Sequence, residues 1–329
     1  MTKLQLTRRT LCLGALGLSA CDARNVRTLR SADTHPTGYP TVEAVRSFGK
    51  EIAKASDNRL KLDLYAGGQL GGERDTLEIA IFGGIDFNRV NLAPLNTFAP
   101  ETIVPSLPFI FKSVAHMRAA MDGAPGERIL ASLERRGLIG LCFYDSGARS
   151  FYTRDRIIRT PEDLNGLKIR VQNSDIYVSM VEALGGDATP MAFGEVYQGL
   201  VQGVVDGAEN NWPSYDNTRH AEAAPFYSLT RHVMAPEVFV MSARRWKTLN
   251  TKDQDLIKQE ARNSVAVMRN LWDARVEASR KILIERGVEV FEPDLTPFQN
   301  AVKPVWEKYL KTPELQSLAD DILKIGERF

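Results

Sequence analysis

The heptapeptide KIRVQNS, at residues 168–174, decides how this chain is read. Residues 168–172 alternate long polar and apolar side chains, a pattern that predicts a strand with one buried face. Arg170 then lies near the end of that strand. Because a guanidinium keeps its charge in proteins, Arg170 needs a hydrogen-bond acceptor.

A second stretch, VVDGAENNWPSY at residues 204–215, predicts another strand over residues 204–210. The strand is cut off there because Pro213 forces the residue before it out of helical geometry. Asn210 therefore lies where a strand ends, which in open α/β sheets is the edge of the ligand crevice. An arginine and an asparagine amide at two strand ends predict a site for a small carboxylate that also carries hydroxyl groups.

Residues 1–20 predict an export signal, so the mature chain is expected in the periplasm. Lys3, Arg8 and Arg9 form a basic segment, and residues 11–18 form an apolar core. That core is too short to span a bilayer as a permanent helix, and no later stretch is apolar enough to do so.

Two cleavage patterns fit the end of this signal. LSAC at residues 18–21 resembles a lipoprotein cleavage box, which would leave Cys21 acylated and anchor the protein to the inner membrane. Simple cleavage near Ala20 is the alternative, and the arginine pair leaves both the general and the twin-arginine export routes open. Cys142, in the apolar run LIGLCFY, is expected to be a small core residue, so no disulfide framework is predicted.

The net charge argues against nucleic acid as a partner. The chain has 42 basic and 41 acidic residues, and removal of Lys3, Arg8 and Arg9 leaves 39 against 41, or −2. Phosphate binding needs a basic patch, so an anionic ligand would have to be held by a few locally placed arginines. About 300 mature residues exceed the size at which one core stops growing, so two lobes are expected.

Polar residues follow the strands expected in the first lobe. His35 comes just after the first of them, and a strand over residues 87–96 carries Arg89 and Asn91 on one face. Glu73 follows a glycine-rich turn, where it either stabilises the next helix through its dipole or contacts a ligand. A lone histidine is more often structural than functional, and the histidines of this chain show no metal-ligand spacing.

The second lobe is expected to begin near residue 147. Arg149 lies in a strand-like segment, SGARSFYT, upstream of Arg170. Alone, either arginine is more often an ordinary salt-bridge partner than a ligand residue. Phe193 and Trp212 are candidates for an apolar wall against a sugar ring, although aromatic residues in globular chains are more often plain core.

Residues 253–286 contain neither proline nor glycine and carry an apolar stripe, which predicts one long helix. Thr251 and Gln254 fit a capping box at its start. At about 1.5 Å per residue such a helix is longer than one lobe is wide, so it must be shared between the lobes or bent.

These segments resemble the extracytoplasmic solute-binding subunits of TRAP transporters, the DctP family. The matches occur in the family's order over nearly the whole mature chain, and several ordered matches are more specific than any one. They are SADTHPTGYPT, AGGQLGGERD, SGARSFYT, KIRVQNS, TPMAFGEVYQGL and VDGAENN.

The resemblance implies an α/β, two-lobed fold of the type II periplasmic-binding-protein kind, with hinge strands and a long spine helix. Residues 26–147 and 236–275 would form the first lobe, and residues 148–235 and 276–329 the second.

The resemblance also implies a ligand site in the cleft between the lobes. Arg170 would hold a carboxylate with its fork, Arg149 would supply a second cation, and Asn210 would fix the orientation. The further candidate ligand residues are His35, Glu73, Arg89, Asn91, Gln172, Asn173, Phe193, Asn211 and Trp212. Some relatives place an acid near Arg89, so this position is a departure that would change ligand preference.

The motifs GGERD, FNRVNLAPL and ENNWPSY resemble the branch that takes hexuronates such as glucuronate or galacturonate, for delivery to a TRAP membrane permease. A C4-dicarboxylate is the first alternative, although it offers fewer hydroxyls for so many amides and acids. The mature sequence lacks HExxH, GxSxG, paired Cys–His and Rossmann signatures, so no enzyme is expected. An exported hydrolase and a scaffold without a ligand are the remaining alternatives, and neither a cofactor nor a metal is expected.

Overall fold

Residues 26–234 and 236–329 are described by the computed structural model. The export signal predicted for residues 1–20 and the lipidation predicted at Cys21 lie outside the described residues.

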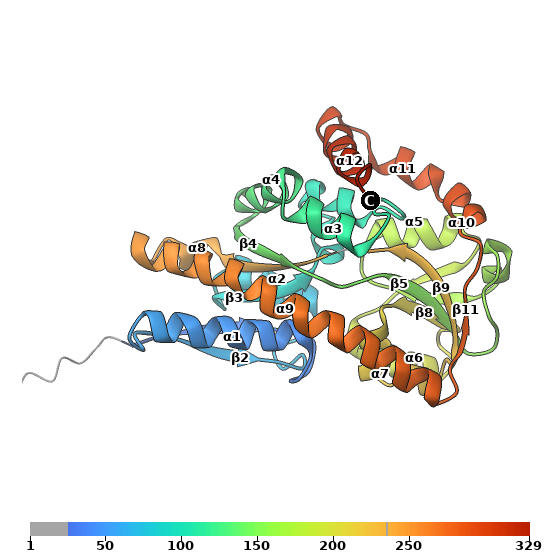
Figure 1. Ribbon diagram of the computed structural model, residues 1–329, viewed down its shortest axis with the longest axis horizontal. Helices are drawn as coiled ribbons and strands as arrows, with labels where there is room; N and C mark the ends of the chain where they lie inside the picture. Colours follow the sequence, from blue (N-terminus) through green and yellow to red (C-terminus); the bar gives the residue numbers. More distant parts are fainter. Residues whose placement is uncertain (1–25, 235) are drawn as a thin grey trace, which may run out of the picture.

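Two β-sheets form the centre of the molecule, with helices packed over them (Figure 1). We call the part built on the five-stranded sheet the first lobe and the part built on the six-stranded sheet the second lobe. The first sheet has the order β2 (Leu60–Tyr65), β1 (Arg27–Ala32), β3 (Phe87–Asn91), β10 (Glu237–Ser242), β4 (Leu138–Tyr144). The second has the order β11 (Glu289–Phe291), β9 (Phe226–Val233), β5 (Arg149–Thr153), β8 (Gly207–Asn210), β6 (Lys168–Val171), β7 (Asp187–Pro190).

The chain crosses between the lobes through strands. It passes from the first sheet to the second between β4 and β5, and it returns between β9 and β10. Strand β10 pairs antiparallel with both β3 and β4, whereas β1 pairs in parallel with β2 and β3. These two crossings correspond to the expected hinge strands.

Helix α9 (Thr251–Glu285) is the predicted long helix, with 35 residues. It packs against α1 (Pro40–Ala55) and β4 of the first lobe and against α7 (Trp212–Asn217) of the second. Figure 1 shows it running diagonally across both lobes. The predicted capping box is wrong: Asn250 is the N-cap and accepts a hydrogen bond from the Asp253 amide at 2.9 Å.

The remaining helices of the described chain pack on the sheets or on one another. The α-helices are α2 (Glu73–Ile81), α3 (Val114–Met121), α4 (Ala124–Ser132), α5 (Asp175–Ala183), α6 (Val196–Val201), α8 (Ala243–Trp246), α10 (Thr296–Ala301), α11 (Lys303–Tyr309) and α12 (Pro313–Gly326). The 3₁₀ helices are η1 (Ala93–Leu95), η2 (Pro100–Ser106), η3 (Leu133–Arg136), η4 (Pro161–Leu164), η5 (Phe193–Glu195) and η6 (His220–Glu222).

The C-terminal helices are divided between the lobes. Helix α11 packs on α5, and α10 packs on β9, both in the second lobe. Helix α12 packs instead on η2, α3 and α4, which follow β3 in the first lobe. The expected second lobe, which took in all residues from 276 onward, therefore differs from this packing at α12.

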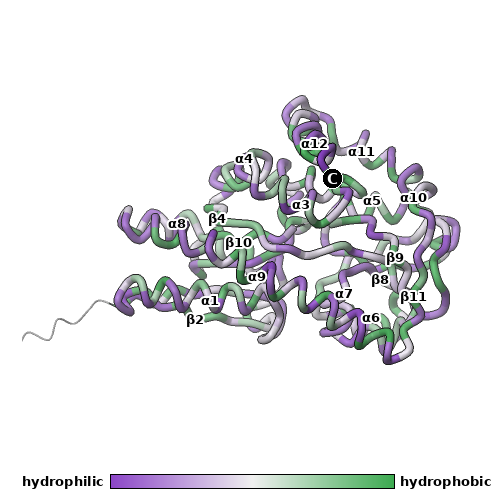
Figure 2. Tube along the Cα trace, in the orientation of Figure 1, coloured by the Kyte–Doolittle hydropathy of each residue, from purple (hydrophilic) through white to green (hydrophobic). Residues whose placement is uncertain are grey.

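The buried faces follow the apolar periodicity of the sequence. Val42, Val45, Phe48 and Ile52 lie on one side of α1 and are buried there. Figure 2 shows hydrophobic and hydrophilic stretches alternating along this helix, as expected when only one face meets the core. Cys142 is buried and forms no disulfide with any described residue, in agreement with its predicted core role.

Candidate functional site

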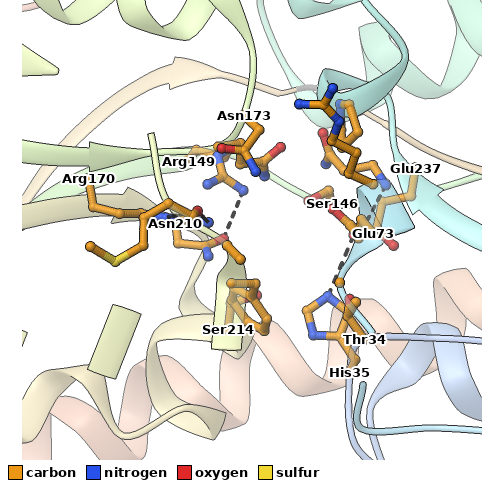
Figure 3. Close-up of a pocket in the computed structure, with 18 of the residues that line it drawn as sticks. Thr34, His35, Glu73, Ser146, Arg149, Arg170, Asn173, Asn210, Ser214 and Glu237 are labelled. Atoms are coloured by element: carbon orange, nitrogen blue, oxygen red, sulfur yellow. Dashed lines mark hydrogen bonds and ion pairs between the residues drawn. The ribbon is translucent and has the colours of Figure 1, made fainter. Parts of the chain in front are cut away.

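A cavity of about 140 Å³ lies between the two lobes and is lined by residues of both. In Figure 3, Thr34, His35, Glu73 and Glu237 lie on one side of this space, and Arg170 and Asn210 lie on the other. Many of the candidate ligand residues meet here. The predicted residues that line it are His35, Glu73, Asn91, Arg149, Arg170, Gln172, Asn173, Phe193 and Asn210.

Arg170 is held in the cavity wall by strand β6, where it lies in register with Thr189 of β7 and Ala208 of β8. Its side chain is buried, and Nε and Nη2 donate to the Met191 carbonyl at 3.0 and 2.7 Å. Nη1 has no hydrogen-bond partner among the described residues. Burial lowers the pKa of Arg170, because the charged form loses its hydration. One edge of a buried guanidinium is thus free to bind an acceptor.

Arg149 differs because an acid of its own lobe already occupies it. Its Nε lies 2.5 Å from Glu209 Oε2, its Nη2 lies 2.7 Å from Glu209 Oε1, and its Nη1 donates to Asn210 Oδ1 at 2.9 Å. Burial alone would raise the pKa of Glu209, but Arg149 and His232, whose Nε2 lies 3.5 Å from Glu209 Oε2, lower it to about 2. Glu209 is therefore ionised at neutral pH and cancels the charge of Arg149.

Asn210 turns its amide toward the cavity from the end of β8. Its Oδ1 accepts from Arg149 Nη1 and from the Asn211 backbone amide, both at 2.9 Å. These two bonds fix which way the amide points. Its Nδ2 group consequently faces away from them and is available to donate to a ligand oxygen.

Arg89 lies behind the wall of the first lobe and does not line the cavity. It pairs with Asp33 through two nitrogens, and its Nη1 lies 3.0 Å from Glu73 Oε1 and 3.1 Å from Glu237 Oε2. Burial alone would lower the pKa of Arg89, but these carboxylates raise it well above its ordinary value. Arg89 therefore positions Glu73 and Glu237, which face the cavity, and does not itself reach it.

His35 is a neutral member of the same wall. Burial, followed by the nearby Arg89 charge, lowers the pKa of His35 to about 3. Its ring stacks on Tyr39 with centroids 3.8 Å apart, and its Nε2 lies 3.8 Å from Glu237 Oε1. Its Nδ1 has no hydrogen-bond partner among the described residues.

Other polar atoms around the cavity also have no described partner. They include a donor, Asn91 Nδ2, and an acceptor, Gln172 Oε1, in addition to His35 Nδ1. Buried polar groups are normally hydrogen-bonded, so unpaired ones that converge on a cavity indicate a polar ligand. A mixture of donors and acceptors suits hydroxyl groups, which both donate and accept.

The two lobes touch around the cavity. Phe193 of η5 meets the His35 ring edge-on at 5.0 Å, and Tyr39 Oη lies 2.9 Å from Ser214 Oγ. The Asn96 side-chain amide bonds to Ser174 Oγ at 3.0 Å. The described arrangement is therefore one in which the cleft is closed over its cavity.

Comparison with known proteins supplies the family. Residues 31–312 match the model of DctP, "bacterial extracellular solute-binding protein, family 7". The chain belongs to this family. A solute-binding protein of Chromohalobacter salexigens is 40% identical over 309 residues, which are 93% of this chain and 92% of that protein.

Solved TRAP periplasmic solute-binding proteins have the same fold. One from Xanthobacter autotrophicus Py2 holds β-D-galacturonate; it is 49% identical, with a TM-score of 0.88, covering 90% of this chain and 99% of that one. One from Chromohalobacter salexigens holds D-glucuronate; it is 41% identical, with a TM-score of 0.88 and the same coverage. The two-lobed periplasmic-binding-protein fold with a long helix is thereby confirmed, in a family of transport proteins rather than enzymes.

None of the helices in residues 26–234 and 236–329 is both long and apolar enough to cross a membrane. Within the same ranges, no group of three or more histidine, cysteine, aspartate or glutamate residues could hold a metal ion.

Two further candidates do not reach this cavity. Asn211 is the N-cap of α7: its Oδ1 accepts from the Ser214 amide, and its Nδ2 donates to the Ser146 carbonyl, each at 2.8 Å. Trp212 stacks on Tyr227 with centroids 4.1 Å apart and lines a different groove, beside Trp272 of α9. The turn into α7 after Asn210 sends these side chains away from the cleft.

Sequence reasoning missed several residues of the wall. They include Thr34, Ser146, Met191, Ser214 and Glu237. Glu237 had a detectable signal, because a single acid opens the otherwise apolar strand EVFVM. An acid in a buried strand is costly unless it is paired or functional. The small polar residues carried no comparable signal.

Proposed function

We propose that this family member binds a hexuronate, of the glucuronate or galacturonate type, in the cavity between its lobes. The observation that carries the proposal is the free Nη1 edge of Arg170, a buried cation bonded only to a neutral carbonyl. A ligand carboxylate would complete its hydrogen bonds and neutralise its charge, and a charge-assisted bond is stronger in a buried site than in water.

The rest of the wall supports a hydroxylated ligand. Asn91, Gln172 and His35 present unpaired donors and acceptors, and Phe193 offers an aromatic face. The cavity volume of about 140 Å³ restricts the ligand to a small molecule. Relatives with bound galacturonate and glucuronate supply a precedent for such a ligand.

The affinity required is ordinary. A hexuronate has about 13 heavy atoms, and roughly 0.6 kcal/mol per atom already gives micromolar binding. Ligand contacts to both lobes would favour the closed arrangement, since a ligand shifts an equilibrium toward the state it binds better.

In the cell, we propose, the protein is exported to the periplasm and hands its ligand to a TRAP membrane permease. Family membership supports this role. Uptake of labelled galacturonate by vesicles that hold the cognate permease should require this protein.

Calorimetric titration of the purified mature protein tests the ligand. D-Glucuronate and D-galacturonate should bind with micromolar dissociation constants, whereas succinate and D-glucose should bind at least about 100-fold more weakly. If succinate binds more tightly than the hexuronates, the ligand of this protein is a C4-dicarboxylate and not a hexuronate. Release of free uronic acid when the protein is incubated with uronides would instead make it a hydrolase.

A further inference from the structure

The two walls of the cavity carry different charges. In the second lobe, Glu209 neutralises Arg149, so Arg170 remains as the uncompensated cation. In the first lobe, Asp33, Glu73 and Glu237 share a single guanidinium, that of Arg89. Three carboxylates against one cation leave this wall with an excess of negative charge.

Glu237 is the most enclosed acid that faces the cavity. Its side chain is 3% exposed, compared with 16% for Glu73. Glu237 Oε2 has an ion pair with Arg89 but no well-aligned hydrogen bond within the described chain. Burial raises the pKa of Glu237, and the nearby charges of Arg89 and Arg149 oppose that rise.

The other charged residues of the lining lie toward solvent. Arg74 is exposed, with a 73% exposed side chain, and pairs with Glu78 at 3.6 Å. Asp75 accepts from the Gly72 amide at 3.0 Å. Arg74 therefore supplies no cation to the enclosed part of the first-lobe wall, and Asp75 is exposed.

We propose that Glu237, supported by Glu73, selects acids with one carboxylate and rejects acids with two. This inference rests on the proposed function, in which Arg170 holds the first carboxylate. The opposite end of the ligand then faces Glu237, across the cavity in Figure 3. A hydroxyl there donates a hydrogen bond to the Glu237 carboxylate. A second carboxylate would meet a like charge in a poorly solvated space and leave the acceptor unsatisfied.

Two open-chain acids separate charge from shape. Galactonate and galactarate have the same six-carbon chain, and galactarate has a carboxylate where galactonate has a terminal hydroxyl group. Displacement titrations against D-galacturonate should show that the parent protein prefers galactonate over galactarate by at least about 30-fold. Equal affinities would overturn the proposal. So would failure of both acids to bind at their highest soluble concentrations, since selection would then depend on the sugar ring.

The variant Glu237→Gln keeps the size of the side chain and removes its charge. It should strengthen galactarate binding about tenfold and weaken D-galacturonate binding about fivefold, because a charge-assisted hydrogen bond becomes a neutral one. Opposite shifts for the two ligands are not expected from a general structural defect. Glu73→Gln should shift both ligands in the same directions, and it provides the test if Glu237→Gln does not fold.

Glu51→Gln is the matched control, because Glu51 is an exposed acid of α1 in the same lobe. It should leave the galactonate-to-galactarate ratio unchanged. An unchanged ratio in both Glu237→Gln and Glu73→Gln would overturn the proposal while D-galacturonate binding by the parent still supports the proposed function. If the parent does not bind D-galacturonate at all, the proposed function itself fails.

Discussion

Arg149 and Arg170 are both buried in the second lobe and both line the same cavity, yet their surroundings differ. Arg149 makes a two-pronged pair with Glu209 and a further bond to Asn210. Arg170 donates only to a backbone carbonyl and keeps one nitrogen unpaired. Two buried arginines in one cavity are therefore not equivalent. Arg149 is already paired with an acid of the protein, whereas Arg170 has no such partner and can bind an anionic ligand.

The largest effect should come from removing the paired arginine. Arg149→Met leaves Glu209 buried without its counter-ion, and breaking a buried pair in this way costs about 3–5 kcal/mol. The free energy of unfolding from urea denaturation should fall by that amount. A loss below about 1 kcal/mol would show that the Arg149–Glu209 pair does not stabilise the lobe.

Arg170→Met should have the opposite profile. It removes a buried cation without stranding an acid, so the free energy of unfolding should change by less than about 1 kcal/mol. Hexuronate affinity should fall at least about 100-fold, close to 3 kcal/mol, as measured by calorimetry. Arg159→Met, at an exposed arginine above the Phe291 ring, is the control and should keep full affinity.

Low pH should affect the stability of the Arg149→Met and Arg170→Met variants differently. The pKa of Glu209 is lowered to about 2 in the folded protein, from an ordinary value of 4.5, so its contribution to stability is present above pH 4.5 and lost as the pH falls toward 2. Between pH 5 and pH 3 this loss is about 2 kcal/mol. Arg170→Met should keep this part of the pH dependence and Arg149→Met should lack it, as measured by urea denaturation at both pH values. If the free energy of unfolding falls equally between pH 5 and pH 3 in both variants, the Arg149–Glu209 pair is not the cause of this pH dependence.

The smallest effect concerns two aromatic residues. Phe193→Ala removes the contact with the His35 ring across the cleft and should weaken hexuronate binding about fivefold, since such pairs contribute about 1 kcal/mol. Trp212→Phe should leave affinity within about twofold, because Trp212 packs on Tyr227 outside the cavity. Calorimetric titration of both variants with the hexuronate measures these two changes in affinity.

Much of the fold follows from the apolar periodicity of the sequence and from its turn, proline and helix-capping residues. Strand β2 spans Leu60–Tyr65, where polar and apolar residues alternate between flanking turns. The strand predicted over residues 87–96 is shorter, since Pro94 lies in η1 and lacks the amide hydrogen that a ladder needs. Asn250 displaced the expected cap of α9, because asparagine caps a helix at least as well as threonine.

The site was predicted less completely than the fold. Strand ends and the family pattern pointed to Arg170, Arg149 and Asn210, and these three residues line the cavity. Which of two arginines is free depends on Glu209, a pairing across neighbouring strands that no local pattern encodes. The direction in which side chains point after a turn also depends on tertiary packing and not on local sequence. Trp212 was expected in the cleft for this reason, but it lines a different groove.

The most direct test combines one variant with one chemical change in the ligand. D-Galacturonate and D-galactose differ at the carboxylate, and their affinities can be compared in the parent and in Arg170→Met. The free guanidinium edge predicts that the parent prefers D-galacturonate by at least about 100-fold and that Arg170→Met loses most of this preference. A preference for D-galacturonate that survives intact in Arg170→Met would contradict the account.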